Sequence, residues 1–236
     1  MSKKAASFRR AGTYYPVFFN IEGKRCVVVG GGQVASRKVK TLLDFGAKID
    51  VISPEICTEL VELRENQRIR VFQRQYQPGD LSGAFLAIVA TDNSETNYQV
   101  ANEGRSQRVP VNVVDNAENS DFILPSLVRR GDVTIAISTA GRSPALARKI
   151  RTRLEKDFGE EYAALVQLID EIRCELKQRG IKIDNETWQE ALELDLLAGL
   201  VRQGQPEKAR VLLRERLSEH LLKQPGEVRK VFQDAD

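Results

Sequence analysis

The residues best suited to chemistry gather in a glycine-rich turn near the start of the chain. The β-branched run at residues 25–29 predicts a buried parallel strand, and Gly30, Gly31 and Gly32 follow it directly. Residues 36–45 then have the apolar spacing of a helix. Strand, glycine turn and helix in this order form the context in which a G-x-G-x-x-A pattern binds a dinucleotide.

Each position of this pattern has a physical role in such a site. Gly30 permits the tight turn, Gly32 lets a pyrophosphate approach the backbone, and Ala35 keeps the helix close to the strand. Unpaired N–H groups at the helix N-terminus would hold the phosphates. A glycine turn that holds no ligand is the alternative, and the presence of both strand and helix makes it the weaker one.

Asp115 is the candidate for proton chemistry. It ends the run at residues 111–115, which predicts a parallel strand, and ligands of open α/β sheets bind beyond the carboxyl ends of strands. Thr91 and Asp92 follow the preceding predicted strand, residues 85–90, at the equivalent place. A carboxylate beside a nicotinamide can accept or donate a proton. A capping or turn aspartate explains the position equally well, so both interpretations stay open.

The end of the second predicted strand, residues 49–52, bears on the choice of cofactor. An acid about twenty residues beyond the glycines would bind a ribose 2′-hydroxyl. Here Ser53 stands at the strand end, followed by Pro54 and Glu55. Because the sequence has no arginine at this strand end to favour a 2′-phosphate, we expect NAD rather than NADP.

A second polar cluster begins a helix further along the chain. Ser143 suits the N-cap and Pro144 the first helical position. Gly141 and Arg142 precede them, so a guanidinium and free N–H groups could share a carboxylate there. Other basic residues nearby are Arg129, Arg130, Arg148, Lys149, Arg151 and Arg153. A solvated basic surface is the simpler explanation, although a substrate with several carboxylates would suit it.

The elements that must position these residues fall into two patterns. Through about residue 115, strands alternate with helices, which predicts an α/β fold with a Rossmann-type parallel sheet. The pattern then changes, because residues 122–138 predict an antiparallel hairpin. From about residue 159 the chain is helical, with breaks expected at Gly180, near Asp184 and Asn185, and at Gln205 and Pro206.

We therefore expect three parts. They are an NAD-binding domain over residues 1–115, a dimerisation segment over residues 116–155 and a helical domain over residues 156–236.

Composition and residue counts exclude several classes of protein. The chain has 236 residues, 29% of them charged, and a net charge of +3, which is too small to indicate a nucleic-acid-binding protein. No apolar run approaches the about 20 residues of a membrane helix, and no secretory segment follows the start, so we expect a cytoplasmic protein. The basic residues of the segment 1–11 predict a disordered tail.

The cysteines and the single histidine offer little for catalysis or metal binding. Cys26 lies in the first predicted strand, and Cys57 and Cys174 lie in helical patterns, without the spacing of a metal site or a disulfide framework. His220 is on a late predicted helix, which excludes a histidine-based triad with the groups above.

Together these motifs resemble the precorrin-2 dehydrogenase / sirohydrochlorin ferrochelatase family of siroheme biosynthesis. The resemblance covers about residues 15–155 in order. The segments that carry it are Tyr15-Pro-Val-Phe, Val27-Val-Val-Gly-Gly-Gly-Gln-Val-Ala, Arg37-Lys38, Ala90-Thr-Asp-Asn, Asn112-Val-Val-Asp, Phe122-Ile-Leu-Pro-Ser and Ile137-Ser-Thr-Ala-Gly-Arg-Ser-Pro-Ala-Leu-Ala-Arg.

The resemblance implies NAD-dependent oxidation of precorrin-2 to sirohydrochlorin by a homodimer. By motif position, Asp115 matches the family's catalytic aspartate and Ser138 a serine near the substrate. The substrate residues that we expect are Asn112, Ser138, Gly141, Arg142 and Ser143. The cofactor residues are Gly30, Gly31, Gly32, Gln33, Val34, Ala35, Ser53, Pro54, Glu55, Thr91 and Asp92.

Two further questions follow from the resemblance. Some members also insert ferrous or cobalt ion as a substrate, whereas others only dehydrogenate; this sequence has no metal-ligand spacing, so lyase activity stays open. No methyltransferase domain follows, so we expect precorrin-2 to come from a separate enzyme.

Two rival functions remain. A redox-sensing module would bind NAD without turnover, but no helix-turn-helix is recognisable. A short-chain dehydrogenase would need Tyr-x-x-x-Lys, which none of the 5 tyrosines begins.

Overall fold

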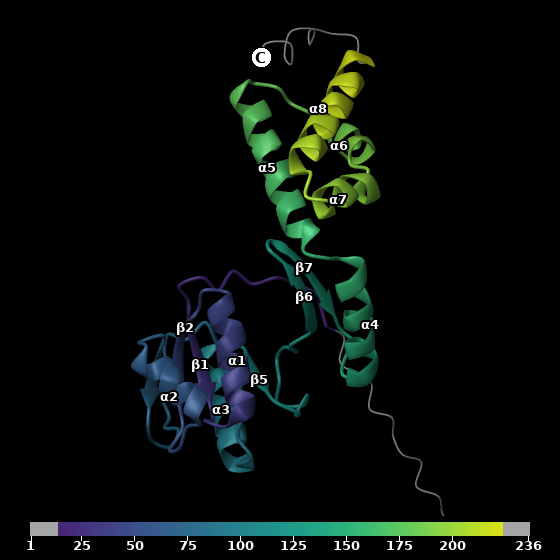
Figure 1. The fold of residues 1–236 in the computed structure, drawn as a ribbon. Helices are drawn as coiled ribbons and strands as arrows, with labels where there is room; N and C mark the ends of the chain where they lie inside the picture. Colours follow the sequence, from purple (N-terminus) through teal and green to yellow (C-terminus); the bar gives the residue numbers. More distant parts are fainter. Residues whose placement is uncertain (1–13, 224–236) are drawn as a thin grey trace, which may run out of the picture. The chain divides into compact units, whose positions relative to one another are not determined.

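The computed structural model describes residues 14–223, apart from the side chains of residues 220–223, and forms two compact units. The first unit extends to Leu124 and includes residues 140–142, and the second comprises residues 125–139 and the chain from Ser143 onward (Figure 1). The predicted basic tail, residues 1–11, lies outside the described residues. The finer division into three parts stays a prediction.

A five-stranded parallel sheet forms the centre of the first unit, in the order β3-β2-β1-β4-β5. The strands are β1 (Arg25–Val29), β2 (Lys48–Ile52), β3 (Ile69–Phe72), β4 (Leu86–Val89) and β5 (Val111–Val113). β4 is buried along its whole length, as a strand between two covered faces should be. The strand order reverses between β1 and β4, the place where Rossmann-type sheets bind ligands. The predicted fold class is confirmed.

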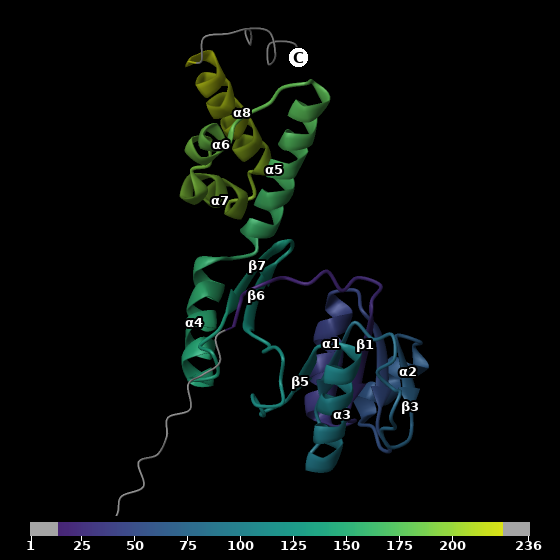
Figure 2. The same cartoon turned by 180° about the vertical axis from the view of Figure 1, so that it is seen from behind.

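Three helices and one long connection cover the two faces of this sheet (Figures 1 and 2). The helices are α1 (Gln33–Asp44), α2 (Thr58–Glu65) and α3 (Ser94–Gln107). Val39 of α1 and Leu60 of α2 belong to one buried cluster, whereas Val100 of α3 belongs to the other. Tyr76 and Leu81, from the connection between β3 and β4, join α3 on that second face.

The ends of α1 and α2 test two local predictions. α1 ends where the sequence predicts, because Gly46 adopts φ +76° and its N–H donates to the carbonyl oxygen of Leu43. The expectation that Cys57 lies within a helix is wrong. Cys57 is the N-cap residue of α2, with extended φ −72° and ψ 164°.

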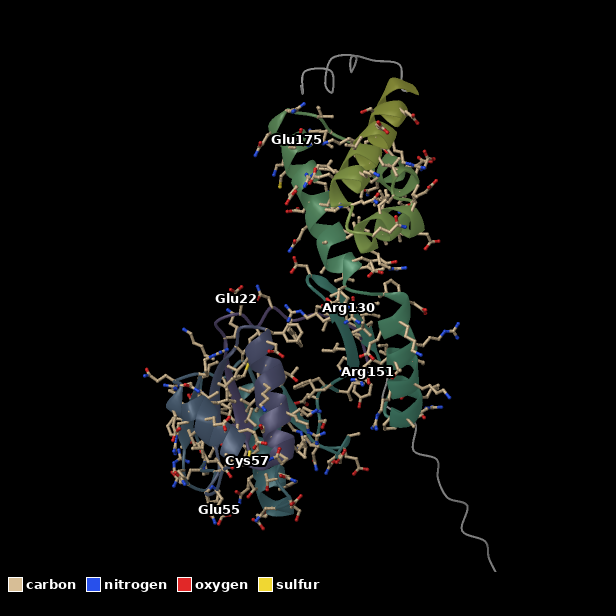
Figure 3. The ribbon with its side chains drawn as sticks, in the orientation of Figure 1. Glu22, Glu55, Cys57, Arg130, Arg151 and Glu175 are labelled. Atoms are coloured by element: carbon tan, nitrogen blue, oxygen red, sulfur yellow. The ribbon has the colours of Figure 1, made fainter. Side chains whose placement is uncertain are left out.

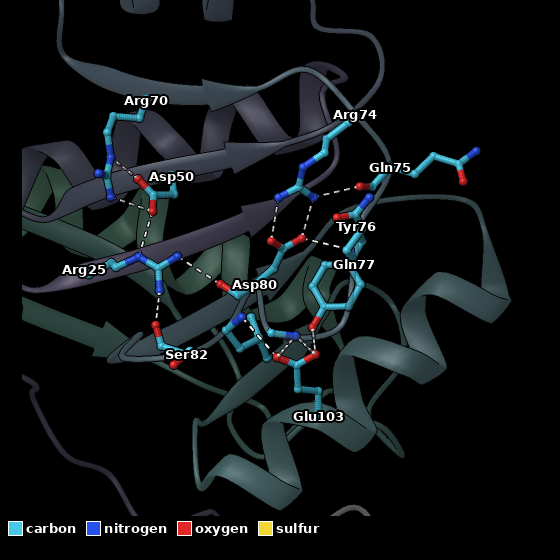
Figure 4. A network of polar contacts seen from close by, with 12 residues as sticks. Arg25, Asp50, Arg70, Arg74, Gln75, Tyr76, Gln77, Asp80, Ser82 and Glu103 are labelled. Atoms are coloured by element: carbon cyan, nitrogen blue, oxygen red, sulfur yellow. Dashed lines mark hydrogen bonds and ion pairs between the residues drawn. The ribbon is translucent and has the colours of Figure 1, made fainter.

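A buried carboxylate ties three elements of the first unit together (Figure 4). Asp50 in β2 is 1% exposed, and Arg25 and Arg70 both donate to it at 2.7 Å. Such a buried charge is tolerable because it is fully paired. Arg25 also donates to the carbonyl oxygens of Asp80 and Ser82, so the same guanidinium holds the β3–β4 connection against the sheet.

Glu103 of α3 holds that connection from the other side (Figure 4). The Tyr76 hydroxyl donates to it at 2.6 Å, and the backbone N–H groups of Gly79 and Leu81 donate to it as well. Burial and the adjacent Glu103 carboxylate raise the pKa of Tyr76 well above its usual value. The connection is therefore fixed in place although it contains no helix.

The second unit begins with the predicted hairpin. β6 (Ser126–Arg130) and β7 (Val133–Ile137) pair antiparallel, with Ser126 opposite Ile137, and α4 (Pro144–Asp157) follows. Ser143 accepts a hydrogen bond from the N–H of Leu146, which confirms the predicted N-cap.

Four helices complete this unit: α5 (Glu161–Gln178), α6 (Asn185–Ala191), α7 (Leu194–Arg202) and α8 (Pro206–Lys223). The predicted breaks at Gly180 and at Asp184 are one break, because both residues lie in the single loop between α5 and α6. The predicted break before Pro206 is present, and a further break at Leu192 and Glu193 was not expected. The local sequence does not signal the break at Leu192 and Glu193. The break lets Ala191 of α6 and Leu197 of α7 pack in the same buried cluster, so we attribute it to tertiary packing. Within the described residues, no helix is long and apolar enough to cross a membrane.

The thiol of Cys26 should be inert in the folded protein. Burial raises its pKa from 9.0 to about 11, whereas Cys174 is exposed and Cys57 is partly exposed. Because the folded pKa lies above the unfolded one, the thiol's contribution to stability is complete below about pH 9 and is lost as the pH rises through about 11.

We expect a thiol reagent at pH 8 to label Cys174 rapidly and Cys26 only on global unfolding, as followed by mass spectrometry of the labelled peptides. In Cys26→Val, folding stability should fall less than in the parent protein as the pH rises from about 9 to about 11. Native-state labelling of Cys26 at the rate of Cys174 would contradict this assignment.

Candidate active site

The three glycines after β1 differ in their surroundings. Gly30 has φ +123°, and a Cβ there would lie 2.8 Å from the carbonyl carbon of Ala90 and closer still to its oxygen. At Gly31 a Cβ would lie 2.9 Å from the carbonyl carbon of Glu55, again with the oxygen closer. At Gly32 a Cβ would meet nothing within 4 Å. Packing therefore requires the first two glycines, and the third faces open space.

The start of α1 offers the amide groups that a phosphate needs. Gly32 is its N-cap, and among the described residues no side chain caps the helix there and no acid stands in its first turn. Ala35 is fully buried, as the pattern predicts for a helix held close to its strand. A pyrophosphate fits this geometry, since Gly32 leaves room for it in front of the open N–H groups.

Gln33 and Val34 are exposed in the first turn of α1. The Gln33 amide donates to both carboxylate oxygens of Glu59, at 3.0 and 2.9 Å, and so joins α1 to α2. The backbone N–H of Glu59 and the Gln33 amide together lower the pKa of Glu59. A contact of Gln33 and Val34 with the cofactor stays a prediction.

Hydrogen bonding and close packing hold the segment after β2 against the glycine turn. The buried Ser53 hydroxyl donates to the carbonyl oxygen of Glu55 at 2.7 Å, and the Cys57 N–H donates to the Gly31 carbonyl oxygen at 2.8 Å. Since its proton is already used, Ser53 can meet a ribose only as an acceptor. Pro54 and Glu55 are exposed, and Figure 3 shows Glu55 at the end of the unit opposite Glu22.

The end of β4 completes the candidate cofactor site. Thr91 Oγ1 accepts from the N–H of Asn93, the N-cap of α3, and the exposed Asp92 lies between them. A Cβ on Gly30 would lie 3.4 Å from the Thr91 nitrogen. The fold therefore brings the glycine turn and the residues after β2 and β4 to one edge of the sheet.

Asp115 lies at this same edge, but not within a strand. β5 ends at Val113, so the predicted strand end at Asp115 is wrong by two residues. Asp115 is exposed in a turn with φ +59°, closed by the Asn116 N–H donating to the Val113 carbonyl oxygen. Aspartate is among the residues that tolerate this left-handed conformation, because its side chain can bond the local backbone.

Lys38 lies near Asp115, although the sequence named it only within the Arg37-Lys38 segment and did not predict it as a site residue. Burial, and then the neighbouring Arg37, lower the pKa of the Lys38 ammonium, and the Asp115 carboxylate acts in the opposite direction. Asp115 therefore lies within electrostatic reach of α1. The sequence signal for Lys38 was its place in the Arg37-Lys38 segment of the resemblance.

The expected substrate residues have varied surroundings. Asn112 is buried in β5, and its amide donates to the Phe122 carbonyl oxygen at 2.8 Å, which folds the following segment back along the strand. Gly141 and Arg142 are exposed in the first unit's segment 140–142. Ser138 and Ser143 belong to the second unit, where Ser138 is exposed and Ser143 caps α4. Their contact with substrate stays a prediction.

Part of the expected basic surface serves the packing of the second unit. The Arg130 guanidinium, labelled in Figure 3, donates to the carbonyl oxygens of Glu155 and Phe158. Arg151 lies 3.5 Å from the Glu155 carboxylate. Arg130 therefore does not extend a free basic surface as the sequence suggested. Across the described residues, no cluster of three or more potential metal-ligating side chains is present.

Substitutions at adjacent glycines should separate folding from cofactor binding. Gly31→Ala forces a Cβ into the Glu55 backbone and should lower the free energy of unfolding by about 1–3 kcal/mol. Gly32→Asp should fold normally, since aspartate is a favourable N-cap, but should abolish NAD binding by placing a carboxylate at the phosphate position. Thermal unfolding and calorimetric titration with NAD measure the two effects. Unchanged NAD affinity in Gly32→Asp would remove the cofactor from this turn.

Comparisons with known proteins agree with this geometry. A family model described as putative NAD(P)-binding matches residues 17–126, and one described as sirohaem biosynthesis protein central matches residues 130–156. A siroheme synthase from Nitrosococcus oceani is 39% identical over 91% of this chain, and one from Methylobacillus flagellatus is 38% identical over 86%. These matches cover 46% and 44% of the relatives, so the chain spans about half the length of the curated relatives it matches.

A solved structure described as SirC, precorrin-2 dehydrogenase, is similar in fold to most of this chain. The TM-score is 0.65 at 27% identity, over 87% of this chain and 98% of that one. The chain therefore has the NAD(P)-binding and central segments of the siroheme-synthesis family that its motifs indicate, and the resemblance to that family is confirmed.

Proposed function

We propose that the chain oxidises precorrin-2 to sirohydrochlorin with NAD as the hydride acceptor. The observation that carries this proposal is the similarity to SirC, a precorrin-2 dehydrogenase, over nearly the whole of that structure. The open helix start at Gly32 and the carboxylate of Asp115, both at the carboxyl edge of the sheet, agree with it.

The reaction removes one hydride and one proton from the substrate. Bound NAD supplies the hydride acceptor. Asp115 accepts the proton, because its exposed carboxylate stands at the edge where the nicotinamide would lie. The Asp115 carboxylate acts to raise the pKa of the nearby Lys38 ammonium, against the lowering by burial and Arg37. Arg142 is an exposed cation that suits the carboxylates of the substrate.

Substitutions of Asp115 test the proton step. Asp115→Asn keeps the shape and tolerates φ +59°, whereas Asp115→Ala adds a left-handed backbone cost of roughly 1–2 kcal/mol. Asp115→Gly removes the carboxylate without that strain. We expect the Asn and Gly variants to bind NAD normally and to lose turnover by about 10²–10⁴-fold.

Asp195→Asn provides the control, since it neutralises an exposed carboxylate on α7 in the other unit and should leave turnover unchanged. Anaerobic turnover with precorrin-2 and titration with NAD are the two measurements. Full turnover by a folded Asp115→Asn protein would end the assignment of Asp115 as the base.

A module that senses redox state would bind NAD without consuming it. The same titration and turnover measurement distinguishes the two functions, because only a dehydrogenase forms NADH in proportion to sirohydrochlorin. Chelation of ferrous or cobalt ion, with the metal as a substrate, stays a prediction, as does a cytoplasmic location.

The homodimer is also part of the proposal, with residues 122–138 as its main interface. Within the described residues, β6 and β7 form a sheet of only two strands, which leaves a backbone edge of each strand unpaired. Two-stranded sheets are marginally stable alone, so pairing with a second copy would stabilise this one. We expect sedimentation at micromolar concentration to give the mass of a dimer. A monomer under these conditions would contradict the proposal.

A further inference from the structure

We infer that the ion pair between Arg74 and Asp80 selects NAD over NADP. Strand pairing brings Arg74 beside the end of β2, and the Asp80 carboxylate already binds its guanidinium. The inference rests on the proposed function, since it concerns the cofactor of that same site. It names a specificity-determining pair rather than a catalytic one.

The position of Arg74 follows from the pairing of β2 with β3. The two strands run parallel, with Ile52 opposite Phe72. The Phe72 carbonyl oxygen accepts from the N–H of Ser53 at 3.2 Å and from the N–H of Arg74 at 2.8 Å. Arg74 therefore leaves the sheet beside Ser53, where the ribose 2′-hydroxyl of a Rossmann-bound dinucleotide lies. Sequence alone separates the two residues and suggests that no arginine is present there.

The guanidinium of Arg74 is already engaged on both terminal nitrogens (Figure 4). Its Nη1 and Nη2 donate to the two carboxylate oxygens of Asp80 at 2.8 and 2.7 Å, and Nη1 also donates to the Gln75 carbonyl oxygen. A guanidinium binds a 2′-phosphate best when both of its terminal nitrogens are free to donate to the phosphate. Here the phosphate would have to displace a carboxylate and would meet its negative charge.

Asp80 is held in place independently of Arg74. The Gln77 N–H donates to Asp80 Oδ2 at 2.8 Å, and the side chain is only 13% exposed, against 37% for Arg74. The hydrogen bond from Arg74 is the main cause of the lowered pKa of Asp80, which keeps the carboxylate charged at neutral pH. On this inference, the fixed carboxylate and its arginine lie beside the ribose, where they leave room for a hydroxyl but disfavour a phosphate.

A purely structural role is the competing explanation, because Asp80 also closes the β3–β4 connection. That role predicts lower stability on substitution and an unchanged ratio of NADP to NAD affinity. The specificity role predicts a change in that ratio that depends on Arg74. The two explanations therefore differ in a quantity that does not depend on overall stability.

The test is calorimetric titration of the full chain with NAD and with NADP. Asp80→Asn retains an acceptor for the Gln77 N–H but no charge, and should raise NADP affinity about tenfold, as one charge-assisted hydrogen bond would. NAD affinity should change by less than about twofold. Asp80→Asn combined with Arg74→Gln should lose the gain. Asp80→Ser provides a second neutral variant should the first not fold.

Arg70→Gln is the matched control, because Arg70 lies in β3 just before Phe72, as Arg74 follows just after it, and both flank the Phe72 ring, but the partner of Arg70 is Asp50. It should leave the affinity ratio unchanged. An unchanged ratio in folded Asp80→Asn, or a gain that survives Arg74→Gln, would overturn the inference. Failure of the parent protein to bind NAD would overturn both this inference and the cofactor site. NAD binding with a shifted ratio in Asp80→Asn but no oxidation of precorrin-2 would support the inference and overturn only the dehydrogenase.

Discussion

The close contact of the β1–α1 turn with the segment after β2 is the constraint on which the candidate site depends. Gly31 has no side chain, so the Glu55 backbone can lie directly against it, and the Cys57 N–H bonds its carbonyl oxygen. This contact fixes the end of β2 relative to the start of α1. Gly30 does the same toward Ala90 and hence β4. Three strand ends thereby share one edge, and the open space at Gly32 lies among them.

The sheet must also be stable enough to hold this edge in place, and buried ion pairs and hydrogen bonds contribute to that stability. Asp50 would be costly inside β2 without its two arginines. Arg25 and Glu103 then fix the β3–β4 connection, which covers part of a face where a helix would otherwise lie. The same connection supplies Asp80, which pairs with Arg74.

Much of this arrangement follows from local sequence, and the rest follows from tertiary contacts. The glycine turn, the antiparallel hairpin and the Ser143-Pro144 helix start each carry a local conformational signal, and the structure has all three. The left-handed turn at Asp115 and the N-cap position of Cys57 were missed, since neighbouring strands and helices impose them. Arg74 was missed for the same reason, because strand pairing alone brings it beside Ser53.

We propose that this chain transfers a hydride from precorrin-2 to NAD. The most direct measurement is anaerobic absorbance spectroscopy of the purified chain with precorrin-2 and limiting NAD, recording NADH and sirohydrochlorin together. Both products should appear at the same rate and in equal amounts until NAD is exhausted. Tight binding of NAD with no NADH formed while precorrin-2 remains unchanged would contradict this proposal.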